Sequence, residues 1–157
     1  MSERLTPEWT QTLEEAFGSS GAWGRKGELW LLAVVKQWGY DTIDYENDIK
    51  CQLRGHDIAI RKSSWKRFYT IDVKNNIRKD KCFYVDTSVK GWLLNPKRDS
   101  DRIWHVNPVD GLMAWYDRKD MIDVIQPLEN TGNFNVEWCD NRFNFIEWRD
   151  NVHVPIP

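Results

Sequence analysis

Two short apolar segments carry side chains that could together act on a phosphate. Asp57 comes directly before the apolar residues 58–60, and the segment 69–74 carries Asp72 and Lys74 on alternating positions. Carboxylate oxygens are the ligands that a hard divalent cation takes in proteins, often with several waters kept for chemistry. An ammonium beside them can orient a nucleophilic water or stabilise a developing phosphate anion. These groups are typical of phosphodiester hydrolysis.

The two segments are predicted to pair as an antiparallel hairpin. Both are rich in β-branched or aromatic residues, and residues 62–64 between them have a turn-like composition. A fold near this turn places Asp57 opposite Thr70, one diagonal step from Asp72. Because side chains on a strand alternate between faces, Asp57, Asp72 and Lys74 are expected to share one face of the sheet.

The pattern resembles the PD-(D/E)xK nuclease superfamily, whose members carry one acid on a strand and an acid-x-Lys triplet on the partner strand. The resemblance covers residues 24 to about 107; His56 stands where the family name has Pro, and Asp72 stands where Glu is commoner. It implies a restriction-endonuclease-like core, in which a mixed β-sheet is flanked by helices. It also implies a DNA endonuclease that uses Mg²⁺, with Mn²⁺ as a substitute.

Carried over position by position, the resemblance assigns roles to five residues. Asp57 and Asp72 would be metal ligands, and the backbone carbonyl of Val73 would add another oxygen. Lys74 would be the catalytic lysine. Glu28, in the first turns of an expected helix, would be an accessory acid and metal ligand, although an acid near a helix start also has a purely structural role. Cutting both strands of a duplex, or resolving a junction, would call for a homodimer.

Charge is unevenly distributed along a chain whose net charge is only −2. Residues 50–102 contain 14 Lys and Arg against 6 Asp and Glu, a balance of +8, whereas the rest contains 8 against 18, a balance of −10. Basic residues therefore concentrate around the proposed site, where phosphates would be neutralised. The residues expected to contact DNA phosphates are Arg61, Lys62, Lys66, Arg67, Arg78, Lys79, Lys97 and Arg98.

The whole chain, residues 1–157, is predicted to form one α/β domain. Helices are expected at 7–17 and 24–38, separated by the glycines of residues 18–21. Strands are expected at 41–45, 52–60, 67–74, 81–86 and 101–106, a helix at 109–125, and a C-terminal β-hairpin of 133–138 with 143–148.

Cysteine usage and apolar content indicate the cellular compartment of the protein. The three cysteines have no paired spacing, which favours a reducing compartment without disulfides. No apolar run approaches the ~18 residues of a membrane span, and no signal-peptide core is visible, so a cytoplasmic location is expected. Two other functions remain open: a nucleic-acid-binding module of the same fold that does not cut, and a protein-interaction domain that uses some of its ten Trp residues.

Overall fold

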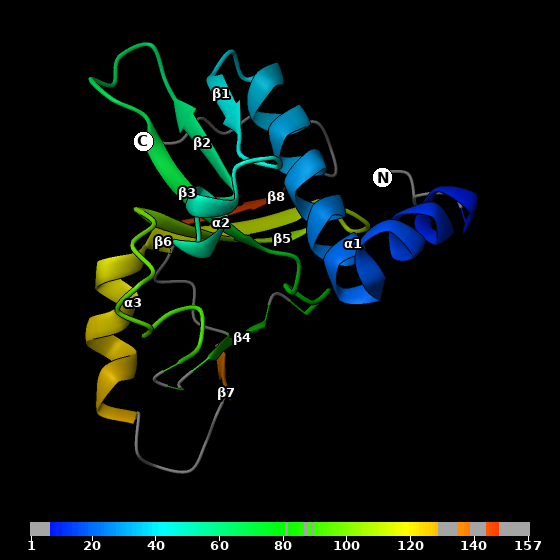
Figure 1. The fold of residues 1–157 in the computed structure, drawn as a ribbon. Coiled ribbons are helices and arrows are strands. Elements are labelled where there is room, and N and C mark those ends of the chain that lie inside the picture. Colours follow the sequence, from blue (N-terminus) through cyan, green and yellow to red (C-terminus); the bar gives the residue numbers. More distant parts are fainter. Residues whose placement is uncertain are drawn as a thin grey trace.

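Helices on both sides of a six-stranded sheet give the molecule a mixed α/β architecture (Figure 1). The computed structural model describes residues 7–80, 82–86, 88, 90–128, 135–138 and 144–147. In chain order the elements are α1 (Pro7–Gln37), β1 (Asp41–Asp44), α2 (Ile49–Leu53), β2 (Ile58–Arg61), β3 (Tyr69–Lys74), β4 (Phe83–Asp86), β5 (Arg102–Asn107), β6 (Leu112–Asp117), α3 (Arg118–Ile125), the 3-10 turn Gln126–Leu128, β7 (Asn135–Trp138) and β8 (Asn144–Glu147).

The large sheet is mixed, as the sequence predicted. Its strands lie in the order β1-β2-β3-β5-β6-β8, and a separate two-stranded sheet pairs β4 with β7. β3 and β5 are parallel, whereas the other neighbouring pairs of the large sheet are antiparallel. β3 therefore lies in the interior of the sheet, between β2 and β5, and β1 and β8 form its two edges.

Alternating side chains bury the two faces of the sheet in different cores. Val73 and Trp104 belong to the core that α1 covers, together with Leu31 of that helix. Ile103 belongs to the opposite core, which Met121 of α3 helps to close. β5 and β6 are buried on both faces, and β6 accordingly has a nearly continuous apolar sequence, whereas β5 also carries the buried polar residues Arg102 and His105. The strands that carry the predicted site are thus held in the middle of two packed layers.

The two N-terminal helices of the prediction are one helix, α1. The glycines of residues 18–21 predict a break, but the helix continues through them from Pro7 to Gln37. Gly27 lies where α1 packs against the sheet, because a Cβ at this position would lie 2.9 Å from Cγ2 of Val106 and 3.0 Å from Cβ of Asn75. The absence of a Cβ at Gly27 lets α1 approach the sheet closely, and this packing offsets the weak helix propensity of glycine.

The predicted strand 52–60 was wrong in its first half, which lies in α2 and the turn after it. The Asp48 side chain accepts a hydrogen bond of 3.0 Å from the Cys51 backbone N–H and so caps this helix. Gly55 then takes a φ of 78°, a left-handed value that favours glycine. The chain reverses there and enters β2 with Asp57 directly before it.

The predicted helix 109–125 was also wrong, because its first part is β6. β6 follows β5 through a turn in which Gly111 has a φ of 67°. The apolar residues of β6 contact both cores, so their spacing fits a buried strand as well as a helix. The helical part of the prediction is α3, Arg118–Ile125.

The predicted C-terminal hairpin does not form. β7 pairs with β4 in the small sheet, and β8 pairs with β6 at the edge of the large one. The expectation of reduced cysteines is corrected as well, since Cys51 is free but Cys82 is disulfide-bonded. None of the helices in the described ranges has both the length and the apolar character needed to cross a membrane.

Candidate active site

β2 and β3 bring the two predicted aspartates together. The strands pair with Ile58 opposite Ile71, and the Asp57 backbone N–H also donates a 3.0 Å hydrogen bond to the Ile71 carbonyl. The predicted register was therefore wrong by two residues, because it placed Ile58 opposite Tyr69. A shift of two leaves the paired side chains on their faces, so Asp72 and Lys74 still share one face of β3. Asp57 lies directly before β2, and its hydrogen bond to Ile71 departs from the regular register of the two strands.

Asp72 is a buried carboxylate held by two cations. Its side chain is 2% exposed, Oδ1 lies 3.1 Å from the Lys74 ammonium, and Oδ2 lies 3.5 Å from Nη1 of Arg98. The predicted lysine is therefore in place beside the predicted acid. Arg98 was expected to contact only phosphates, yet its guanidinium reaches the same carboxylate.

Asp57 forms no ion pair with any of the described residues, although the charge of Lys74 acts on it from a distance. Its Oδ2 accepts a 2.8 Å hydrogen bond from the Val73 backbone N–H. Burial, reinforced by the negative charges of Asp72 and Glu28, raises the pKa of Asp57 to about 8. The N–H and C=O of one residue in an extended strand point to the same side, so the Val73 carbonyl lies toward Asp57, as its predicted role requires.

Glu28 reaches the same cluster from α1. It faces a cavity of about 290 Å³ that Asp57 and Gln52 also line. Burial raises the pKa of Glu28, and the charges of Asp44 and Asp72 act in the same direction against the lowering effect of Arg25. The third predicted carboxylate is thus electrostatically coupled to the other two.

Arg25 is a site residue that the sequence prediction missed. Its guanidinium donates to Glu28 at 3.0 Å, to Asp44 of β1 at 2.6 Å and to Glu46 at 3.0 Å. These bonds raise the pKa of Arg25 well above its ordinary value and lower that of Asp44. The Arg25-x-x-Glu28 spacing on one helix face was a visible signal. The pairing of Arg25 with Asp44 of β1 had no signal in the sequence, because it depends on the tertiary fold.

Lys74 also contacts an aromatic ring. Its ammonium lies 4.9 Å from the centre of the Trp92 ring, and Trp92 makes a T-shaped contact with His105. The two ring nitrogens of His105 lie 2.5 Å from Asn76 and 2.6 Å from the Tyr116 hydroxyl. Burial, with Lys74 nearby, lowers the pKa of His105 well below its ordinary value, so the ring is a neutral support.

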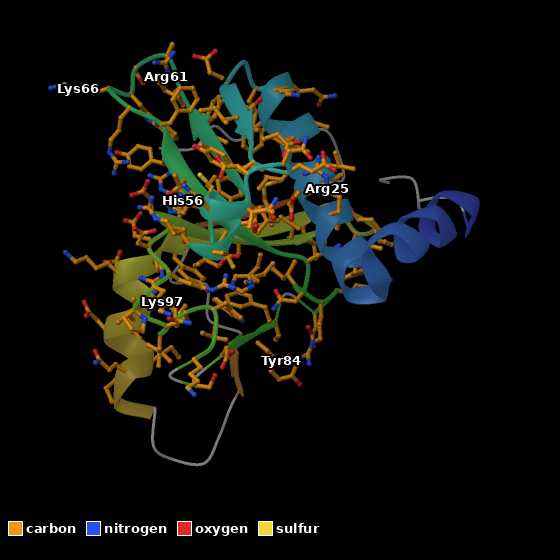
Figure 2. All side chains as sticks on the ribbon, viewed as in Figure 1. Arg25, His56, Arg61, Lys66, Tyr84 and Lys97 are labelled. Atoms are coloured by element: carbon orange, nitrogen blue, oxygen red, sulfur yellow. The ribbon has the colours of Figure 1, made fainter. Side chains whose placement is uncertain are left out.

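The residues expected to contact phosphates do not form one patch. Arg61 and Lys66 lie at the outer end of the β2–β3 hairpin, whereas Lys97 lies well away from them, on the α3 side of His56 (Figure 2). Some of the predicted cations have carboxylate partners. Arg61 pairs with Asp41, Arg67 with Asp101 and Arg78 with Asp80, each at 2.9 Å. Exposed pairs of this kind contribute little to stability, so their cations can exchange a carboxylate for a phosphate.

The oxygen atoms of this site are ligands that a hard divalent cation prefers, but they are not positioned around a common point. No group of three or more His, Cys, Asp or Glu side chains within the described residues is arranged to hold a metal ion. However, the Asp57 and Asp72 carboxylates and the Val73 carbonyl are oxygen donors on two adjacent strands. A cation bound to both carboxylates would replace the cationic partners of Asp72 and the proton of Asp57.

Comparisons with protein-family models, with curated proteins and with solved structures find no match for the chain.

Proposed function

We propose that the protein is a metal-dependent DNA endonuclease of the PD-(D/E)xK type, with Mg²⁺ as its cofactor and Mn²⁺ as a substitute. The observation that carries this proposal is the meeting of Asp57, directly before β2, with Asp72 and Lys74 of β3. Asp57 has no ion-pair partner among the described residues, and its ionisation in this half-buried position is costly unless a cation binds it. Perturbed carboxylates of this kind are typical of catalytic sites.

Each residue of the cluster has a role in phosphodiester hydrolysis. Asp57, Asp72 and the Val73 carbonyl would hold the cation, and Glu28 would bind it through a water or hold a second ion. A bound Mg²⁺ supplies Lewis-acid polarisation of the phosphate and a more acidic water. Lys74, which contacts both Asp72 and Trp92, would orient the attacking water and stabilise charge on the phosphate oxygens.

The basic segment 50–102 supplies the electrostatic attraction for DNA in this proposal. Since one such site cuts one strand, we expect a homodimer for cleavage of a duplex or resolution of a four-way junction. Restriction-like, mobile-element and junction-resolving roles share this chemistry. They differ in the DNA that reaches the site.

Cleavage of supercoiled, linear, nicked and four-way-junction DNA tests the proposal and identifies the role. We expect cutting with Mg²⁺ or Mn²⁺, little with Ca²⁺, and none in excess EDTA or with Asp72→Asn. Asp48→Asn is the matched control, because Asp48 caps α2 away from the cluster. If the protein binds DNA but does not cut it with any divalent ion, the endonuclease hypothesis is rejected in favour of a nucleic-acid-binding module of the same fold.

A further inference from the structure

Asp72 differs from the other acids of the cluster in having a cation on each oxygen. Lys74 holds Oδ1 at 3.1 Å, and Arg98 reaches Oδ2 at 3.5 Å. Lys74 comes from β3 itself, whereas Arg98 comes from the loop between β4 and β5. A cation that binds Asp72 must therefore compete with at least one of these two side chains.

The turn that carries Arg98 is firmly fixed in place. The backbone N–H of Arg98 donates to the Asn95 carbonyl at 3.0 Å, and the next residue, Asp99, donates to the Arg54 carbonyl at 3.1 Å. Arg118 of α3 donates to the carbonyls of Leu93 and Asn95. The base of the Arg98 side chain is thus anchored, while the side chain as a whole is 30% exposed to solvent.

Gly55 makes the meeting of Arg98 with Asp72 possible. A Cβ at position 55 would lie 3.1 Å from Asp72 Oδ2 and 3.4 Å from Arg98 Nη1. The bare backbone of Gly55 therefore forms one wall of the ion pair, directly before the strand that begins after Asp57. Arg98, Gly55 and Asp72 come from three separate segments of the chain, so their contact depends on the tertiary fold.

We propose that Arg98 is a counter-ion of Asp72 that a divalent cation displaces, and that the released guanidinium then contacts a DNA phosphate. This inference rests on the proposed function. Arg98 is suited to both partners, because a guanidinium forms paired hydrogen bonds with either carboxylate or phosphate. Its movement would make cation binding and DNA binding favour each other, since each removes a partner that the other would have to displace.

Binding measurements on Arg98→Gln test the proposal without any cleavage. Loss of the competing guanidinium should tighten Mn²⁺ binding, measured by titration calorimetry, by at least about 5-fold, the low end for coupled sites. Affinity for a fluorescein-labelled duplex, measured by anisotropy, should weaken, and by at least about 5-fold more in Ca²⁺ than in EDTA. Arg98→Lys keeps the charge without the planar fork and should lie between the parent and Arg98→Gln in both assays.

Lys97→Gln is the matched control, because it removes the same charge from the adjacent exposed residue. It should leave Mn²⁺ affinity within about 2-fold of the parent, a change that screened surface charge allows. Its effect on DNA affinity should be the same in Ca²⁺ and in EDTA. Circular dichroism and melting curves of all variants establish that each is folded.

The outcomes separate this inference from the proposed function. If the parent binds Mn²⁺ and Arg98→Gln binds it equally or more weakly, the inference is overturned while the metal site stands. If Arg98→Gln binds Mn²⁺ more tightly but loses the same factor of DNA affinity in Ca²⁺ as in EDTA, the proposed contact of the released guanidinium with a DNA phosphate is overturned. If neither the parent nor Arg98→Gln binds Mn²⁺ at millimolar concentration, the proposed function fails, and the inference fails with it.

Discussion

Asp57→Asn is expected to stabilise the cation-free protein, and increasingly so as the pH rises from 3.8 to about 8. Asn has nearly the same shape, and its amide oxygen can accept the 2.8 Å hydrogen bond from the Val73 N–H. The substitution removes the negative charge that burial and the neighbouring acids Asp72 and Glu28 disfavour. A single polar substitution in a buried site normally destabilises a protein, so a gain would be diagnostic.

The sign follows from the pKa of Asp57, which rises from 3.8 to about 8 on folding. Below 3.8 the carboxyl is protonated in both states and contributes no difference. Between 3.8 and about 8 the unfolded chain loses the proton while the folded protein keeps it, so the parent loses stability as the pH rises. Above about 8 the full loss is present.

The size of the effect can be estimated from the same pKa. At about 1.4 kcal/mol for each pH unit between the two values, the loss is at most about 6 kcal/mol. Relaxation of the protein and entry of water around the charge reduce it, and we expect Asp57→Asn to gain about 2–3 kcal/mol at pH 9. For a protein of this size that corresponds to a rise in Tm of roughly 5–10 °C.

Urea denaturation in EDTA, followed by circular dichroism from about pH 3 to pH 9, measures the free energy of unfolding directly. Asp44→Asn is the control with the opposite sign, because Arg25 lowers the pKa of Asp44. It should destabilise the protein at pH 7 and above, and the difference should shrink as the pH falls below about 4. A variant Asp57→Asn that is less stable than the parent at pH 9, or equally stable throughout, would refute the assigned electrostatics.

Three further predictions follow from the same geometry. Lys74→Ala should lower the cleavage rate roughly 10²–10³-fold, the usual loss for one transition-state donor, while Mn²⁺ binding measured by calorimetry persists. Mg²⁺ affinity measured between pH 6 and pH 8 should rise by about 10-fold per pH unit, because the cation must displace the proton that Asp57 holds below its pKa of about 8; a flat profile would contradict this. Lys66→Ala, at the exposed end of the β2–β3 hairpin, should weaken DNA binding and reduce the slope of log affinity against log salt by about one, whereas an unchanged slope would remove it from the interface.

The sequence predicted the site residues on β2 and β3 because their relation is local. Side chains on paired strands alternate with a period of two, so a register error of two residues did not change which face Asp72 and Lys74 share. Asp57 lies directly before β2, where its N–H bonds the Ile71 carbonyl outside the regular register. The error itself came from the loop of the hairpin. β2 ends at Arg61 and β3 begins at Tyr69, which leaves a longer connection than a turn at 62–64.

The helices and strands that were misassigned share a physical cause. β6 contacts both cores, so it lacks the alternation that identifies a half-buried strand. The C-terminal strands β7 and β8 pair with strands far away in the sequence, and no local pattern selects β4 or β6 as their partners. Gly18 and Gly21 predict a break because glycine has a weak helix propensity, but α1 continues through both of them.

The unequal distribution of counter-ions is the feature that only the folded structure reveals. The sequence predicts equivalent roles for Asp57 and Asp72 as ligands, but the fold gives Asp72 two cationic partners, Lys74 and Arg98. Among the described residues, Asp57 has one backbone N–H donor, that of Val73, and no ion-pair partner. Asp57 instead holds a proton up to a pH of about 8. Binding of one divalent cation would therefore release a proton from one strand and a guanidinium from the other side of the cluster, and the two aspartates would become equivalent only in that bound state.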